Sequence, residues 1–421
     1  MEYSKIILIA NASIWLFTFY HNYQRRKVFD TGAWLIAFLS ALSILSYFLY
    51  NDSIYGLMFQ PITILPCLYY YGVFLAYLVP FRRINAKHQL VINDPDMVIF
   101  NLFAAIIILV ALFRVPGMLR DLPQILYSIV FETEIGAELY NDSRDLVAKT
   151  GHGIRNLPSV LSSAFYGLGI LMSFYYLTLP KKKRNGFILF GLFLAGLIQG
   201  IGTISYGQRG GVIAYMLLII PTYFLFKDNI SNGIKKYTKW IGITLIIIMM
   251  IPIIAITMSR FDTKESNPLS SFYYYAGQSN LYFNNFAFDD NGIRYGDRTI
   301  PLFKRAFGFN NVPHNYVERR EKYPNLYIND EVFSTTVGDF AIDFGPLSAL
   351  IILLIIALII SQGTIIRGGS IYFHQLILLH ITIQFFSIGA LKLDPLADTG
   401  GNLQIIIYVI AYYMFKLSQK H

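Results

Sequence analysis

The chain has 421 residues, of which 55% are hydrophobic and only 14% are charged, and its formal net charge is +9. So few charged residues could not cover the surface of a soluble protein of this length, so lipid must solvate much of it. The positive charge does not indicate nucleic-acid binding, because membrane proteins gather basic residues on one side of the bilayer.

Apolar runs of membrane-spanning length recur from one end of the chain to the other. A helix of roughly 20 apolar residues crosses the hydrocarbon layer, and runs such as 241–256 lack the alternation of a membrane barrel. The sequence therefore predicts an all-α polytopic membrane protein with about eleven transmembrane helices. The first run lacks the features of a cleavable signal peptide, so we expect it to remain as a helix. The expected spans are 6–20, 33–50, 57–79, 97–113, 157–179, 186–205, 210–226, 240–258, 346–366, 371–391 and 403–417.

Basic residues gather in every second connection between these spans, which marks the cytoplasmic side. With eleven spans, the N-terminus lies outside and the C-terminus inside. The same alternation places two long connections outside, 114–156 and 259–344, and the remainder reads as one membrane domain covering 1–421. We call 259–344 the outer connection. The basic clusters are Arg25, Arg26 and Lys27; Arg82, Arg83 and Lys87; Lys181, Lys182, Lys183 and Arg184; and Lys235, Lys236 and Lys239.

Several kinds of chemistry lack support in the sequence. There is no phosphate-binding loop followed by Lys and Ser or Thr, and no cofactor is expected. The Asp-Pro-Asp motif at 94–96 has the spacing of a metal site, but no sheet-forming sequence surrounds it, so we expect no metal. The single cysteine, Cys67, excludes an intrachain disulfide and is expected to pack in an apolar run. His380 lies in a span and is expected to bond a neighbouring helix, so ion-coupled transport is disfavoured.

Arginines at the outer ends of spans are candidates for anion binding. Arg209 lies in a short turn, 205–211, with glycines on both sides, and its guanidinium either binds a phosphate or simply anchors the helix end. Arg260 directly follows the eighth expected span. Other basic residues of the outer connection either meet an anionic ligand or pair with its acidic residues. These are Arg294, Arg298, Lys304, Arg305, Arg319, Arg320 and Lys322.

The outer connection also offers candidates for proton transfer. His314 stands in the segment 312–316, and a histidine with an ordinary pKa can accept a proton from an attacking hydroxyl; the alternative is a structural loop residue. Asp339 and Asp343 precede the ninth expected span, where they act as alternative bases, orient the basic groups or cap a helix. The aromatic stretch 273–288 is expected to be partly helical and interfacial, and it could also border a binding cleft.

Together these features resemble the O-antigen polymerase family, the Wzy-type oligosaccharide repeat-unit polymerases, and more distantly the O-antigen ligases. The resemblance rests on the many-span pattern, on the turn 206–210 as a version of the family's small-residue–Arg–Gly turn, and on a large outer loop followed by Asp343-Phe344-Gly345. The pair His314-Asn315 is similar to a His-Asn pair of the ligases, which leaves the subtype open.

The resemblance implies a GT-C-like transferase in the bacterial cytoplasmic (inner) membrane. It would move a glycan from an undecaprenyl-diphosphate carrier to a hydroxyl of a second lipid-linked unit, without metal, building a polysaccharide such as O-antigen or capsule. A chain-length regulator protein is an implied partner. In that reading the diphosphate is held by Arg209, Arg260, Arg319 and Arg320, and the proton goes to His314 or, failing that, Asp339 or Asp343.

Two alternatives remain at this point. A ligase would use the same donor with a different acceptor. A flippase or exporter of lipid-linked oligosaccharide would need polar residues through the depth of the bilayer, whereas this sequence concentrates its charges at one face.

Overall fold

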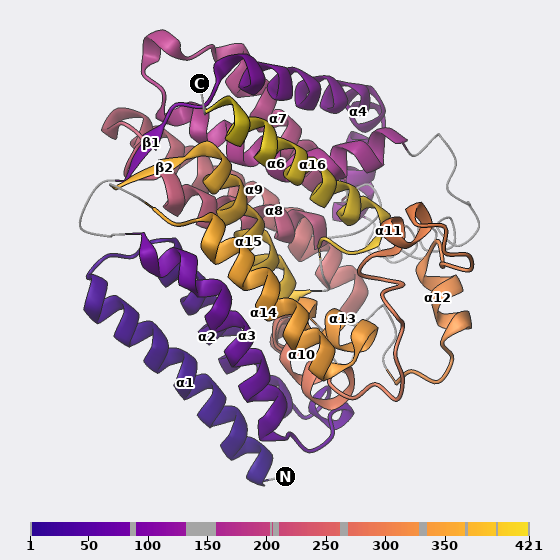
Figure 1. Ribbon diagram of the computed structural model, residues 1–421. Helices are drawn as coiled ribbons and strands as arrows, with labels where there is room; N and C mark the ends of the chain where they lie inside the picture. Colours follow the sequence, from indigo (N-terminus) through magenta and orange to yellow (C-terminus); the bar gives the residue numbers. More distant parts are fainter. Residues whose placement is uncertain are drawn as a thin grey trace. The chain divides into compact units, whose positions relative to one another are not determined.

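The described part of the chain is mostly helical, as the sequence predicted (Figure 1). Seven helices of the described part are long and apolar enough to cross a membrane. The protein is therefore a multi-pass membrane protein of the all-α class. The computed structural model describes residues 2–84, 90–131, 157–202, 204, 210–261, 268–327, 335–366, 369–392 and 395–419.

The seven membrane-length helices coincide with seven of the expected spans. Four further helices contain the other four expected spans. The helices α7 (Gly186–Gly202) and α8 (Gly210–Phe226) are apolar but shorter, and α9 (Asn232–Phe261) and α16 (Asp398–Ser418) contain the expected spans 240–258 and 403–417. The total of eleven spans stays a prediction. The seven are Glu2–Arg26, Thr31–Tyr50, Ile64–Arg83, Met97–Pro116, Ser159–Thr178, Pro346–Gly363 and Phe373–Leu391.

One expected span, 57–79, begins later than its composition indicated. Its first residues form a short 3-10 helix, η1 (Gly56–Met58), and α3 (Ile64–Arg83) starts only after Pro61. Proline disfavours helical backbone in the residue before it, which separates the two elements.

Contacts divide the chain into two compact units, and the single membrane domain expected from the sequence stays a prediction. Unit 1 comprises 1–88, 266–369 and 381–403, and unit 2 comprises 89–265, 370–380 and 404–421. The segments of the two units alternate along the chain, so each unit is assembled from residues distant in sequence.

In unit 1, α1 (Glu2–Arg26) and α2 (Thr31–Tyr50) lie side by side (Figure 1). The Asp30 carboxylate caps α2 by accepting the Ala33 N–H at 2.9 Å. Helix α2 also packs against α10 (Pro268–Tyr282) at Gly277, where a Cβ would lie 2.6 Å from the Leu45 carbonyl oxygen. The Ser46 hydroxyl donates to the Gly277 carbonyl at 2.8 Å, so only glycine permits this approach.

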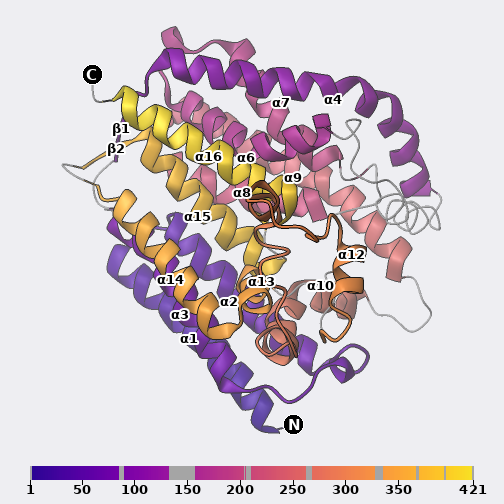
Figure 2. The same ribbon diagram turned by 45° about the vertical axis from the view of Figure 1, so that its right-hand side comes forward.

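The outer connection is largely helical where the structure describes it (Figure 2). Its aromatic stretch forms α10 and a π-helical turn, η5 (Phe283–Ala287), which confirms the expected partly helical segment. Its rings pack on aromatic partners elsewhere in unit 1, as Tyr274 does on Tyr55 with ring centroids 4.7 Å apart. The later elements are α11 (Pro301–Ala306), α12 (Tyr316–Lys322) and α13 (Thr335–Phe344), which precede α14 (Pro346–Gly363).

Unit 2 contains a small sheet beside its helices. The strand β1 (Val91–Asn93) pairs in parallel with β2 (Ser370–Tyr372), with Val91 opposite Ser370. Helix α4 (Met97–Phe131) extends into the expected connection 114–156, whose residues 132–156 lie outside the described part. The helices α4, α6 (Leu157–Thr178) and α7 pack together, and α15 (Phe373–Leu391) follows β2.

Polar residues of unit 2 have structural roles. The His380 ring nitrogen Nδ1 lies 3.0 Å from the Tyr408 hydroxyl on α16, which confirms the expected helix-to-helix bond. In the Asp-Pro-Asp motif, Asp94 accepts the Tyr175 hydroxyl at 2.9 Å, and Asp96 accepts the Val98 N–H at 2.8 Å at the start of α4. Among the described residues no three His, Cys, Asp or Glu side chains come together as metal ligands.

Candidate functional site

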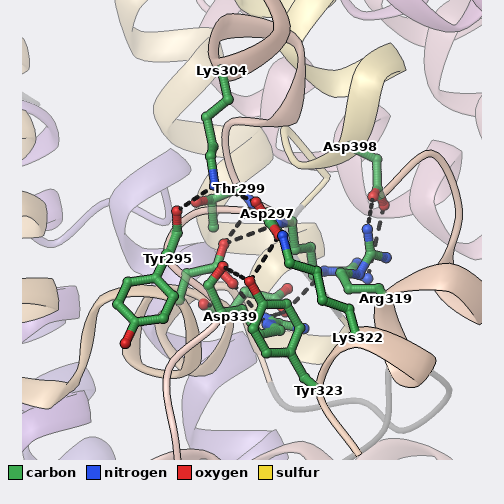
Figure 3. A network of polar contacts seen from close by, with 12 residues as sticks. Tyr295, Asp297, Thr299, Lys304, Arg319, Lys322, Tyr323, Asp339 and Asp398 are labelled. Carbon is green, nitrogen blue, oxygen red and sulfur yellow. Dashed lines mark hydrogen bonds and ion pairs between the residues drawn. The ribbon is translucent and has the colours of Figure 1, made fainter. Parts of the chain in front are cut away.

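A network of buried ion pairs occupies the outer connection in unit 1 (Figure 3). Five segments supply it: the turn 294–299, the helices α11, α12 and α13, and the first residues of α16. Its members are Arg294, Asp297, Arg298, Lys304, Arg319, Lys322, Asp339, Asp343 and Asp398.

Asp339 and Asp343 hold the centre of this network. They are four residues apart, which places them on one face of α13, and their side chains are 1% and 0% exposed. The Arg294 Nε donates to Asp343 Oδ1 at 2.7 Å, and Arg298 Nε lies 2.9 Å from Asp339 Oδ1. Asp343 Oδ2 also accepts the backbone N–H groups of Arg298 and Thr299, at 3.2 and 2.7 Å. These contacts favour the orienting role among those expected for the two carboxylates, because a buried and paired carboxylate cannot reach a substrate hydroxyl.

The turn 294–299 brings its charged side chains to α13. Tyr295 and Gly296 both have positive φ, 54° and 80°, so the backbone reverses there. A Cβ on Gly296 would lie 2.8 Å from Ile300 Cγ1, so glycine is needed at this position. The Arg294 N–H then donates to the Ile342 carbonyl at 3.0 Å and fixes the turn on α13.

Asp297 is fully buried and is paired with two lysines. Lys322 Nζ lies 2.7 Å from Asp297 Oδ2, Lys304 Nζ contacts Oδ1, and the Tyr323 hydroxyl lies 2.8 Å from Oδ2. Burial by itself would raise the pKa of Asp297, but the bonds from Lys304, Lys322 and Tyr323 outweigh burial and hold that pKa below its ordinary value. The carboxylate therefore stays ionised and ties α11 and α12 to the turn.

Arg319 reaches the network through Asp398, at the start of α16. Its side chain is 3% exposed, and its Nη1 donates to Asp398 Oδ1 at 2.9 Å. Asp398 is 50% exposed and has φ of 58°, an unusual backbone conformation for a residue other than glycine. The expected diphosphate ligand Arg319 is thus a buried partner of a half-exposed carboxylate.

An open pocket of about 690 Å³ lies beside the network in unit 1. His314 lines it, as the candidate base, together with Arg305 and Lys322. The backbone of His314 is fixed at the start of α12: its N–H donates to Glu318 Oε2 at 2.8 Å, and Asn315 caps the helix by accepting the Glu318 N–H at 3.0 Å. The remaining wall is Phe309, Asn310, Asn311, Val312, Pro313, Glu318 and Glu321.

Arg305 is the cation of this pocket that carboxylates do not neutralise. Its guanidinium donates to the Pro313 carbonyl at 3.2 Å and to the Thr399 hydroxyl at 2.5 Å. No carboxylate of the described residues lies within 4.0 Å of it. Partial burial lowers the pKa of Arg305, and the carboxylates of Asp398, Glu318 and Asp297 act at longer range to raise it. A guanidinium has five N–H groups, so donors remain for an anion in the pocket.

The other expected site residues are distributed differently. Arg320 is exposed on α12 and does not line the pocket. Arg209 lies outside the described residues, and Arg260 lies in α9, where the structure does not describe its side chain. The structure therefore brings together Arg319, Asp339 and Asp343 in the ionic network and places His314 in the adjoining pocket.

Sequence reasoning did not single out Arg305, Asp297 or Asp398. Arg305 was one of seven similar cations of the outer connection, and only its lack of a carboxylate partner distinguishes it. Asp398 follows the last long connection, and the sequence Asp398-Thr399-Gly400-Gly401 reads simply as a helix start.

Comparisons with protein-family models, curated proteins and solved structures give no match to this chain.

Proposed function

We propose that this protein polymerises oligosaccharide repeat units carried on undecaprenyl diphosphate, by glycosyl transfer at the outer face of the bacterial cytoplasmic membrane. The apolar helices supply the setting in which two lipid-linked substrates meet in a fixed orientation. The pocket of the outer connection supplies polar groups for a sugar diphosphate.

The observation that carries the proposal is that Arg305 and His314 line the same pocket. Arg305 is anchored by neutral oxygens and keeps donors for the diphosphate, whose negative charge grows as the glycosidic bond breaks. Lys322 also lines this pocket, but its Nζ is already paired with Asp297 at 2.7 Å, so Arg305 is the cation available to the diphosphate. The leaving diphosphate is already a weak base, so protonation by a strong general acid is unnecessary.

His314 is the proposed base for the attacking hydroxyl. It is exposed at the pocket, whereas Asp339 and Asp343 are buried in ion pairs. A base must first be within reach of the proton it removes, which favours the histidine over the carboxylates.

The remaining arginines fit the proposal in distinct ways. Arg319 positions the start of α16 through Asp398, whose neighbour Thr399 accepts from Arg305. For Arg209 and Arg260 we retain the diphosphate-binding role that the family resemblance implies. Alanine variants at these two positions, in the assay below, test that role.

The test is a reaction with purified protein in lipid and one defined lipid-linked repeat unit, without metal or nucleotide. The products are separated by glycan length for wild type, Arg305→Ala, Arg305→Lys and His314→Ala. Matched controls remove an exposed arginine and an exposed histidine of α1, Arg25→Ala and His21→Ala. A ladder of multimers that is lost in Arg305→Ala and His314→Ala but kept in both controls supports the polymerase.

Other outcomes separate the alternatives. Transfer of a single glycan to an unrelated acceptor lipid, without a ladder, would identify a ligase. Movement of the intact lipid-linked unit across the bilayer, with no new bond, would identify a flippase. The polymerase proposal fails if several repeat units give no ladder with the intact protein.

A further inference from the structure

Unit 2 contains an apolar pocket that the proposed function does not use. It measures about 560 Å³ and is partly open. The helices α6, α7, α8 and α9 line it with aliphatic and aromatic side chains, among them Phe174, Phe193, Ile219 and Tyr223. Two of its side chains are largely exposed, Phe190 at 64% and Ile241 at 55%, so the pocket faces the surroundings of the helices.

The pocket lies at one end of these four helices. Its lining includes Leu177, next to the last residue of α6, and Gly186, the first residue of α7. It also includes Phe224, two residues before the end of α8, and Lys239, in the first third of α9. From Tyr215 to Phe224 the wall runs about 13 Å along α8, at roughly 1.5 Å per residue, so the pocket reaches well into the apolar part of the helices.

The helix ends around this pocket carry lysines. The short helix η3 (Lys181–Lys183) joins α6 to α7, and α9 brings three further lysines. Two lysines pair with acids: Lys183 lies 3.3 Å from Asp94, and Lys235 lies 3.7 Å from Asp228. Four others are exposed and have no carboxylate within 4.0 Å among the described residues. These four are Lys181, Lys182, Lys236 and Lys239.

An apolar pocket with Lys239 in its wall, and with further exposed lysines on the adjoining helix ends, matches an amphipathic anion. Lipid tails are as apolar as leucine, so a chain fills such a hollow without a polar cost. The lysines then distinguish headgroups, because each one near a negative lipid surface contributes about 1 kcal/mol. A zwitterionic headgroup gains much less from the same lysines.

We propose that this pocket binds one anionic glycerophospholipid, with an acyl chain between α7, α8 and α9 and its phosphate at Lys239 and the neighbouring lysines. The basic clusters predict that this end of the helices faces the cytoplasm. The lipid therefore belongs to the cytoplasmic leaflet, and it differs from the polyprenyl donor of the outer face.

The experiment measures lipid retention by native mass spectrometry of the full chain in detergent, with phosphatidylglycerol or phosphatidylcholine added. We expect one phosphatidylglycerol per protein and no matching retention of phosphatidylcholine. Lys239→Gln should weaken phosphatidylglycerol binding about fivefold, the equivalent of one lysine at a lipid surface. Lys416→Gln, an exposed lysine at the end of α16, is the matched control and should not change it.

A second pair of variants tests the hollow itself. A Cβ on Gly242 or on Gly233 would meet no atom within 4 Å, so both glycines of α9 accept a larger residue. Only Gly242 lines the pocket, so Gly242→Leu should abolish lipid retention and Gly233→Leu should leave it intact. Equal retention of both lipids, unchanged binding in Gly242→Leu, or displacement of the bound lipid by an added polyprenyl phosphate would overturn the proposal.

Discussion

The ionic network around Arg294 and the pocket around Arg305 are built by neighbouring parts of unit 1, yet their charges are arranged differently. In the network each buried cation meets a carboxylate, as Arg294 meets Asp343 at 2.7 Å. In the pocket, Arg305 is held by a carbonyl and a hydroxyl.

The two arrangements have different roles: the ion pairs of the network stabilise the fold, and the cation of the pocket can bind an anion. A buried pair fixes the chain that carries it and has little left to offer a ligand, because its charge is already compensated. A half-buried cation held by neutral oxygens keeps its full charge for an incoming anion. Five predictions test this contrast, from the largest expected effect to the smallest.

Asp343→Asn should destabilise the protein most. It leaves Arg294, which is 3% exposed, without its main counter-charge, and breaking a buried pair from one side costs about 3–5 kcal/mol. Thermal unfolding of the purified protein in detergent measures the loss. If Asp343 were a catalytic base instead, the variant would unfold like the wild type and lose only activity.

Arg305→Ala should show the opposite pattern, with normal folding and lost activity. Removing a donor that stabilises developing charge costs about 10²–10³ in rate. Arg305→Lys keeps the charge but not the planar donor geometry, so its rate should lie between those of the wild type and Arg305→Ala. The assay is ladder formation from the lipid-linked repeat unit; activity close to that of the wild type in Arg305→Ala would remove Arg305 from the site.

The stability contributed by Asp297 should disappear in acid. Its folded pKa lies below the ordinary 3.8, so the contribution is complete above the unfolded pKa and is lost as pH falls through the folded pKa. The melting temperature of wild type should therefore exceed that of Asp297→Asn near neutral pH. The gap should close as the pH falls below about 4; a gap that is constant with pH would contradict the assigned ion pairs.

The stability of Asp398 variants should depend more on the backbone conformation that the new residue tolerates than on its charge. At φ of 58°, Asp398→Ala should cost about 1–2 kcal/mol, because alanine tolerates the left-handed region poorly. Asp398→Gly relieves the strain and Asp398→Asn tolerates it. The Asp398 carboxylate is 50% exposed, so water screens its pair with Arg319, and both variants should be more stable than Asp398→Ala. A larger loss in Asp398→Asn than in Asp398→Ala would show that the pair with Arg319 matters more than the backbone.

Arg320→Ala should have the smallest effect. Its side chain is exposed on α12 and does not line the pocket, so stability should change by less than about 0.5 kcal/mol and the glycan ladder should persist. Both Arg320 and Arg305 belong to the basic set of the outer connection, and the family resemblance singled out Arg320 as a diphosphate ligand. A strong loss of activity in Arg320→Ala would show that the anion lies outside the pocket around Arg305.

The sequence by itself indicated that lipid surrounds much of the chain, and it indicated the fold class and the segments in which charged residues concentrate. Apolar runs such as 346–366 predict helices because a backbone in lipid must satisfy its own hydrogen bonds, and this local requirement can be read residue by residue. The sequence also identified Asp339 and Asp343 as two carboxylates just before the ninth expected span, and the structure places them on one face of α13. His314 was identified because histidines are few in the outer connection.

Only the tertiary structure decided which charges are compensated. Arg294 and Asp343 are 49 residues apart and Arg319 and Asp398 are 79 apart, so no local pattern pairs them. Arg305 differs from Arg298 only in what the folded chain places beside it: Pro313 and Thr399 in one case, Asp339 in the other. Charge compensation depends on distances of a few ångströms in three dimensions, which a linear order of residues does not contain.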